Sequence, residues 1–161
     1  MTTFEIVRDL VLLVLGGTGA VLSIYNFFDI RKRSERRLQV SLQTVTLSSY
    51  EGILTEPVFR VAVTNLGQRN VTVTNLGLEL PEGRTLATLH NGYRGLDDTV
   101  TPKTLADGEI AYRHLSYEDV AGAIQTSDLP LTVKLKPFAV DSAENRHYGD
   151  EIDFNSKEWL L

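Results

Sequence analysis

Three histidines are the side chains of this sequence best suited to acid–base chemistry or metal binding near neutral pH. His90, His114 and His147 lie in separate segments, and no two of them fall within one helical turn. Their spacing matches no HExxH metal site, so we expect each to lie at the surface or at the end of a strand. Cysteine is absent, which excludes a thiol nucleophile and a thiolate metal site.

The segment LLVLGGTGAVL (12–22) has the residue types of a dinucleotide-binding turn, in which glycines let a pyrophosphate approach a helix N-terminus. Leu22 occupies the position of the third glycine, where it would crowd the helix against the strand. No alternation of helices and strands follows, so a parallel sheet is not expected. We therefore expect no cofactor at this segment.

Carboxylates near the C-terminus could offer oxygen ligands to Ca²⁺. Their spacing matches no EF-hand loop, and such residues are common in the turns of β-domains: Asp141, Glu144, Asp150, Glu151 and Asp153. Asp97 and Asp98 are likewise expected in a solvated loop. We predict no metal site, no catalytic residues and no enzymatic activity, with an unrecognised hydrolase or reductase as the alternative.

The most apolar segment, Leu10–Phe28, holds 19 residues without a charge, which is close to the length that crosses a bilayer as a helix. We expect a short tail at 1–9, a transmembrane helix at 10–30 and a basic juxtamembrane linker at 31–37. No basic region precedes the apolar segment and no small-x-small site follows it, so we expect the helix to be retained rather than cleaved as a signal peptide.

Five basic residues follow the apolar segment within seven positions: Arg31, Lys32, Arg33, Arg36 and Arg37. Basic residues stay preferentially on the cytoplasmic side of a membrane, and this run also suits anionic lipid headgroups. We expect a single-pass protein of the inner (plasma) membrane with its C-terminal domain in the cytoplasm. From Leu38 onward there are 10 basic and 17 acidic residues, which argues against nucleic-acid binding.

Small residues recur at four-residue spacing in the apolar segment, as Gly16 with Ala20 and Gly19 with Ser23. This spacing lets two membrane helices approach closely. Self-association in the bilayer is one interpretation, and a span that merely contains several glycines is the other.

Alternating apolar and polar residues after Arg37 predict short strands at 38–47, 57–67, 71–80, 129–140 and 148–154. The segment 104–115 predicts an Asp-Gly turn that leads into a further strand, and a polar turn is expected at 141–146. Val-Thr-Asn-Leu-Gly occurs twice, at 63–67 and 73–77, and predicts turns or bulges with positive φ. One helix is expected at 116–125 with Ser116 as its N-cap. About seven strands in this length favour an immunoglobulin-like β-sandwich over 38–155, with a small barrel as the alternative.

Four segments carry a resemblance to a known family: the two Val-Thr-Asn-Leu-Gly segments, Thr-Leu-Ala-Asp-Gly-Glu (104–109) and Val-Asp-Ser-Ala-Glu-Asn-Arg-His-Tyr (140–148). Together they resemble the immunoglobulin-like domain of small bacterial single-span membrane proteins of uncharacterised function. The resemblance covers 38–155. Its motifs are structural, so it implies a fold and no activity.

The tail 156–161 ends in three apolar residues, Trp159, Leu160 and Leu161. They could dock on the domain or membrane, or contact a partner. Together these features predict a non-enzymatic adaptor or accessory subunit that binds membrane lipid and a protein partner or a second copy of itself. The alternative is an oligomeric membrane effector of the defence type, in which the soluble domain senses a ligand and clustered spans perturb the bilayer.

Overall fold

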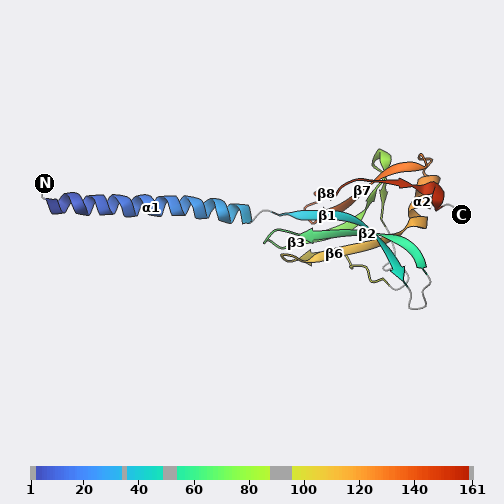
Figure 1. Ribbon diagram of the computed structural model, residues 1–161, viewed down its shortest axis with the longest axis horizontal. Helices are drawn as coiled ribbons and strands as arrows, with labels where there is room; N and C mark the ends of the chain where they lie inside the picture. Colours follow the sequence, from blue (N-terminus) through green and yellow to red (C-terminus); the bar gives the residue numbers. More distant parts are fainter. Residues whose placement is uncertain (1–2, 34–35, 49–53, 88–95, 160–161) are drawn as a thin grey trace. The chain divides into compact units, whose positions relative to one another are not determined.

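A computed structural model describes residues 3–33, 36–48, 54–87 and 96–159 (Figure 1). The chain divides into two units, Met1–Glu35 and Arg36–Leu161. The first unit is the helix α1 (Thr3–Arg33), and the second is a mainly β domain.

Helix α1 extends beyond the expected membrane segment at both ends. Residues 3–9, predicted as a tail, and residues 31–33, predicted as part of the linker, are helical. No proline interrupts this stretch, and charged side chains are tolerated in exposed helical turns, so helical hydrogen bonding continues past the apolar part. The apolar part itself, Leu10–Ile30, has a mean hydropathy of 1.8 and is long and apolar enough to cross a membrane.

The first sheet of the domain has three antiparallel strands in the order β1-β2-β6: β1 (Leu38–Ser48), β2 (Leu54–Asn65) and β6 (Ile110–Ser116). Strand β1 pairs with β2 from Leu38 opposite Asn65 to Ser48 opposite Leu54, with a register shift between Thr46 and Ser48. Among the described residues, β1 therefore forms one edge of this sheet and β6 the other.

The second sheet is built on β3 (Val71–Glu79) and β7 (Thr132–Asp141), which pair antiparallel in its centre. Short strands line both sides of this pair: β4 (Thr85–Leu86) and β5 (Lys103–Leu105) on β3, and β8 (Arg146–Tyr148) and β9 (Ile152–Asn155) on β7. Its outer strands are thus two to four residues long, which leaves little unpaired edge.

One hydrophobic core is shared by the two sheets. Alternate residues of each strand face it, because successive side chains of a strand point to opposite faces. Strand β2 contributes Phe59, Val61 and Val63, and β3 contributes Val73 and Leu76, all of them buried. The domain is therefore two open sheets around a common core, as far as the described residues show.

Helix α2 (Tyr117–Thr126) confirms the predicted soluble helix and its cap. The Ser116 hydroxyl accepts a hydrogen bond of 2.9 Å from the Asp119 amide, which satisfies one of the amides left open at a helix start. Val120, Ala121 and Ile124 turn inward to the core, and the helix lies beside the 3₁₀ helix η2 (Ser156–Glu158).

The repeated Val-Thr-Asn-Leu-Gly segments do not adopt the predicted positive φ. Asn65 is buried and holds a turn by its side chain, accepting from the Gly67 amide at 3.0 Å. A register shift between Val73 and Asn75 does give the predicted bulge, but without positive φ. Gly77 is needed for space instead, because a Cβ there would lie 2.5 Å from the Leu86 carbonyl oxygen. Positive φ occurs at Gly108, in the predicted Asp-Gly turn before β6, and at Gly83 in η1 (Pro81–Gly83).

Candidate functional site

The apolar part of α1 exposes its side chains all round. Leu13, Val21 and Phe28 are each more than 60% exposed, and none of the window Leu10–Ile30 is buried within the described chain. A helix that is apolar on every side needs an apolar surrounding, which a globular core or a membrane can supply.

The small residues of α1 lie on one face, because positions 16, 19, 20 and 23 follow the helical spacing. A Cβ added at Gly16 or Gly19 would meet no atom within 4 Å. Nearby, the Thr18 hydroxyl donates to the Val14 carbonyl at 2.6 Å, so this polar group is satisfied within the helix. The four small residues thus share one side of α1, and their packing against another helix stays a prediction.

The basic run is divided between the two units. The side chains of Arg31, Lys32 and Arg33 lie outside what the structure describes. Arg36 is 38% exposed, and its Nη1 lies 3.8 Å from Oδ2 of the buried Asp141. Arg37 is exposed, and its carbonyl accepts from the Leu66 amide at 2.8 Å. Arg36, predicted as a lipid contact, is therefore also engaged by the domain.

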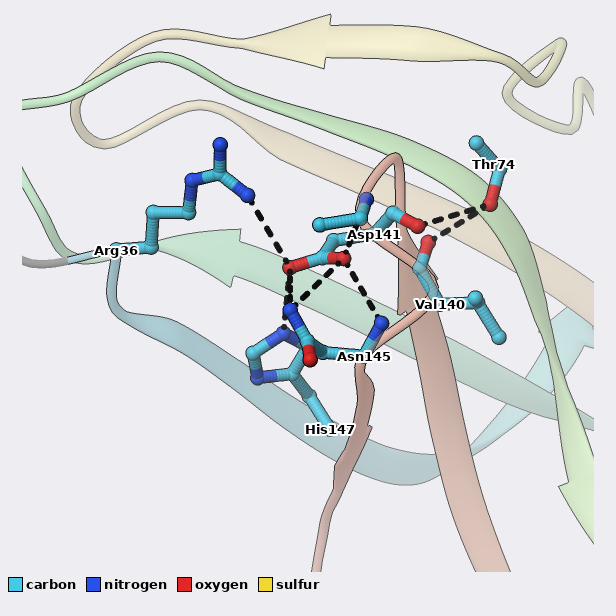
Figure 2. A network of polar contacts seen from close by, with 7 residues as sticks. Arg36, Thr74, Val140, Asp141, Asn145 and His147 are labelled. Carbon is cyan, nitrogen blue, oxygen red and sulfur yellow. Dashed lines mark hydrogen bonds and ion pairs between the residues drawn. The ribbon is translucent and has the colours of Figure 1, made fainter.

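Asp141 organises the turn between β7 and β8 (Figure 2). Its Oδ1 accepts from the amides of Ala143 at 2.8 Å and Asn145 at 3.0 Å. Its Oδ2 accepts from the Asn145 side chain at 3.2 Å and lies 3.3 Å from Nε2 of His147. On the adjacent strand, the Thr74 hydroxyl donates to the Val140 carbonyl at 3.2 Å. The carboxylate is 1% exposed, yet almost fully satisfied by these donors.

This environment changes the acidity of Asp141. Burial by itself raises the pKa of the carboxyl, but the hydrogen bonds from Asn145, His147 and Ala143 favour the charged form. Together these bonds outweigh burial and lower the pKa from 3.8 to about 2. Asp141 is therefore a structural anion that fixes its turn, and of the predicted acidic set it is the one that the structure buries.

A second polar cluster lies on the face of the first sheet away from the core. Asp98 Oδ1 accepts from the His114 amide at 2.9 Å and lies 2.8 Å from His114 Nδ1. On the adjacent strand, Arg60 donates through Nε to His114 Nε2 at 2.9 Å. His114 is 2% exposed, which excludes the surface, one of the two positions expected for the histidines. The expectation of a solvated Asp98 is wrong, because its side chain is 1% exposed.

The cluster resembles an acid–base relay only in its Asp–His pair. Arg60 can only donate, so Nε2 is the acceptor and Nδ1 carries the proton given to Asp98. Both ring nitrogens are then occupied by protein, which leaves neither for a substrate. Asp98 and Thr99 also bond the outer edge of β6, where the Thr99 hydroxyl accepts from the Tyr112 amide at 3.0 Å. The cluster thus closes one edge of the sheet.

The predicted tail is partly structured. Ser156 is buried, and its hydroxyl donates to the Leu131 carbonyl at 3.0 Å. Trp159 packs edge-on against Tyr117, with ring centroids 4.8 Å apart, in a group that includes Phe59 and Phe154. Trp159 thus docks on the domain, and a contact of this residue with a partner stays a prediction. Leu160 and Leu161 lie outside the described residues, as does His90.

Two open grooves mark the second sheet and the beginning of β1. One, of about 560 Å³, is lined by apolar residues that include Leu80, Leu129 and Val133, together with charged ones. The other, of about 410 Å³, is lined by polar groups that include Arg37, Tyr148 and Asp150. Within the part of the chain that the structure describes, no three His, Asp or Glu side chains are placed to hold a metal ion.

Comparisons with known proteins add little to this geometry. No protein-family model matches the sequence, and no curated protein matches it. Among solved structures, the chain is similar to a Bordetella pertussis protein described as ApaA, at 16% identity and a TM-score of 0.32, over 74% of this chain and 91% of that one. It is also similar to a structural genomics target described without a function, at 13% identity and a TM-score of 0.28, over 78% and 89% of the two chains. Scores this low establish neither a shared fold nor a shared function.

Proposed function

We propose that this chain is a single-pass membrane protein whose β-domain acts as a non-enzymatic adaptor or accessory subunit at the inner leaflet. The observation that carries the proposal is the apolar part of α1, whose side chains are exposed over Leu10–Ile30. Exposing so many large apolar side chains to water is unfavourable, and a bilayer removes them from it. Arg31, Lys32 and Arg33 follow directly, which favours a cytoplasmic domain by the positive-inside rule.

The domain, in this proposal, is an immunoglobulin-like β-sandwich related to those of small bacterial single-span proteins. Two sheets around a common core and short outer strands support it. The non-enzymatic part of the proposal is supported by the clusters at Asp141 and His114, whose polar groups bond to turns and strand edges of the domain and leave neither ring nitrogen of His114 open to a substrate.

Alkaline carbonate extraction tests the anchor. The full chain should stay with membranes, and a variant carrying Leu15→Arg and Ala20→Arg should be extracted, because each arginine near the bilayer centre costs about 2.5–3.5 kcal/mol. Leu15→Val with Ala20→Val is the matched control and should remain in the pellet. Extraction of the unaltered chain would contradict the proposal.

Protease added outside spheroplasts tests the orientation. A cytoplasmic domain should survive this treatment and be cleaved only after the cells are lysed. Cleavage in intact spheroplasts would place the domain outside and reverse the topology proposed here.

A second candidate function is an oligomeric membrane effector, and the small-residue face of α1 favours it. Gly16 and Gly19 leave room for a neighbouring helix, which bulky residues would remove. Gly16→Leu with Gly19→Leu should abolish toxicity if clustered spans perturb the bilayer. If the protein is an adaptor, the same variant should capture its partner from detergent-solubilised membranes as well as the unaltered chain does.

A further inference from the structure

The outer edge of β1 differs from every other sheet edge among the described residues. It has 11 residues, without a charge or a proline (LQVSLQTVTLS). The outer strands of the second sheet have two to four residues each. The outer edge of β6 is bonded by Asp98 and Thr99. Long, uncharged edges are the ones that accept another strand, and proteins normally protect them with charges, prolines or bulges. The register shift of β1 lies between Thr46 and Ser48, so the pairing with β2 is regular from Leu38 to Thr46.

Among the described residues, only the beginning of this edge is covered. The Val40 carbonyl faces Gly149 so closely that a side chain at position 149 would collide with it. Because this carbonyl points away from β2, and backbone direction alternates along a strand, residues 42, 44 and 46 should also direct their amides and carbonyls outward. Within the described residues, no strand pairs with this side of β1.

The side chains of β1 suit pairing with an identical strand. Val40 is buried in the core and Leu42 packs against it, while Gln39 and Gln43 lie on the exposed face. Antiparallel pairing about a two-fold axis perpendicular to the sheet keeps the core-facing residues of both copies on one face. The domain from Leu38 onward carries a net charge of about −7, yet two β1 edges would meet without opposing like charges.

We propose that residues 42–46 of β1 pair antiparallel with the same residues of a second copy of this chain, joining two three-stranded sheets into one of six strands. The pairing adds a partner, a second copy of this chain, to the proposed function. It rests on that function in one respect, because a shared membrane would hold the two copies close together. It uses the domain alone, so it differs from association through the small-residue face of α1.

Cysteine-specific crosslinking tests the pairing, because the natural chain has no cysteine. When residues 42–46 pair with themselves, Gln43 of one copy lies opposite Val45 of the other, so two Gln43→Cys side chains are diagonal neighbours, within about 8 Å. A short bis-maleimide should therefore crosslink full-length Gln43→Cys in detergent micelles at least about tenfold faster than Gln68→Cys. Gln68 is also exposed, but lies in the turn after β2. Equal rates for the two variants would overturn the proposal.

A charge variant provides an independent readout. Gln43→Lys with Val45→Lys places lysines opposite each other in the paired edges, so the dimer dissociation constant should rise by about tenfold. The control, Gln68→Lys with Asn70→Lys, adds the same charge at exposed positions off this edge and should leave the constant unchanged. An unchanged unfolding midpoint would show that the β1 variant still folds; an unchanged constant would overturn the proposal.

Adding Gly16→Leu and Gly19→Leu to the Gln43→Cys variant distinguishes pairing through β1 from association through α1. Crosslinking of the Gln43→Cys variant that persists in this background supports pairing through β1, and its loss there would assign association to the helices. Failure of the membrane proposal appears instead in carbonate extraction, which the β1 variants should not alter.

Discussion

The guanidinium of Arg36 lies 3.8 Å from the carboxylate of Asp141, which joins a residue two positions before β1 to the turn that follows β7 (Figure 2). The two residues are 105 positions apart in the sequence. Arg36 is part of the run predicted to contact lipid, and Asp141 is buried by the domain. The beginning of β1 is therefore fixed both by pairing with β2 and by an ion pair to the second sheet.

Replacing Asp141 should destabilise the domain more than replacing its cationic neighbour. Asp141→Ala removes the acceptor of two backbone amides and of the Asn145 side chain, and should lower the free energy of unfolding by about 2–3 kcal/mol. Arg36→Ala removes only a long, partly exposed ion pair and should cost less than about 1 kcal/mol. Urea unfolding of the full chain in detergent measures both, and equal losses would contradict this account of the turn.

The stability contributed by Asp141 should depend on pH in the acid range. Its pKa is about 2 in the folded domain against an ordinary value of 3.8, so folding favours the charged form. The contribution, about 2 kcal/mol, is present above pH 4 or so and is lost as the pH falls towards about 2. Asp141→Asn should flatten this part of the curve of unfolding free energy against pH. A variant curve as steep as that of the unaltered chain would show that other carboxyls cause the loss.

Two glycines should respond in opposite directions to alanine. At Gly77 a Cβ would lie 2.5 Å from the Leu86 carbonyl oxygen, so Gly77→Ala must displace β4 and should cost about 1–3 kcal/mol. At Gly122, within α2, a Cβ meets nothing within 4 Å, and Gly122→Ala should stabilise by about 0.5–1 kcal/mol. Thermal unfolding followed by circular dichroism compares the two, and stabilisation by Gly77→Ala would refute the close approach of β3 and β4.

The edge of β6 should depend on Asp98. Asp98→Ala removes the acceptor of the buried His114 amide and ring, and should cost about 1–3 kcal/mol. Asp98→Asn keeps an oxygen in place and should cost less. Hydrogen exchange at the His114 amide measures the effect locally, and unchanged protection in Asp98→Ala would show that this amide has another acceptor.

The sequence was most informative where local rules decide the structure. Alternation placed β1, β3 and most of β2 within a few residues of their observed bounds, and the Ser116 cap placed α2. The apolar run likewise indicated the helix at Leu10–Ile30. Periodicity failed at the end of the domain, where the expected turn 141–146 contains the start of β8 and the expected strand 148–154 is split between β8 and β9.

The polar clusters could not be predicted, because they join residues that only the tertiary fold brings together. Asp98 and His114 are 16 positions apart, and no spacing rule links a loop carboxylate to the edge of a later strand. Asn65 was expected to adopt positive φ, but its side chain holds the turn by bonding the Gly67 amide and the Leu105 carbonyl. An asparagine in a turn suits either solution, and the residue type alone does not distinguish them.

The connection between the helix and the domain also has a mechanical consequence. Any tension along the chain from α1 would enter the domain at Arg36 and then at Leu38, the first residue of β1. The ion pair with Asp141 would bear part of this force, and the strand pairing between β1 and β2 would bear the rest before the force reached the core. A force applied through α1 would therefore act first on β1, the strand whose outer edge pairs with no other described strand.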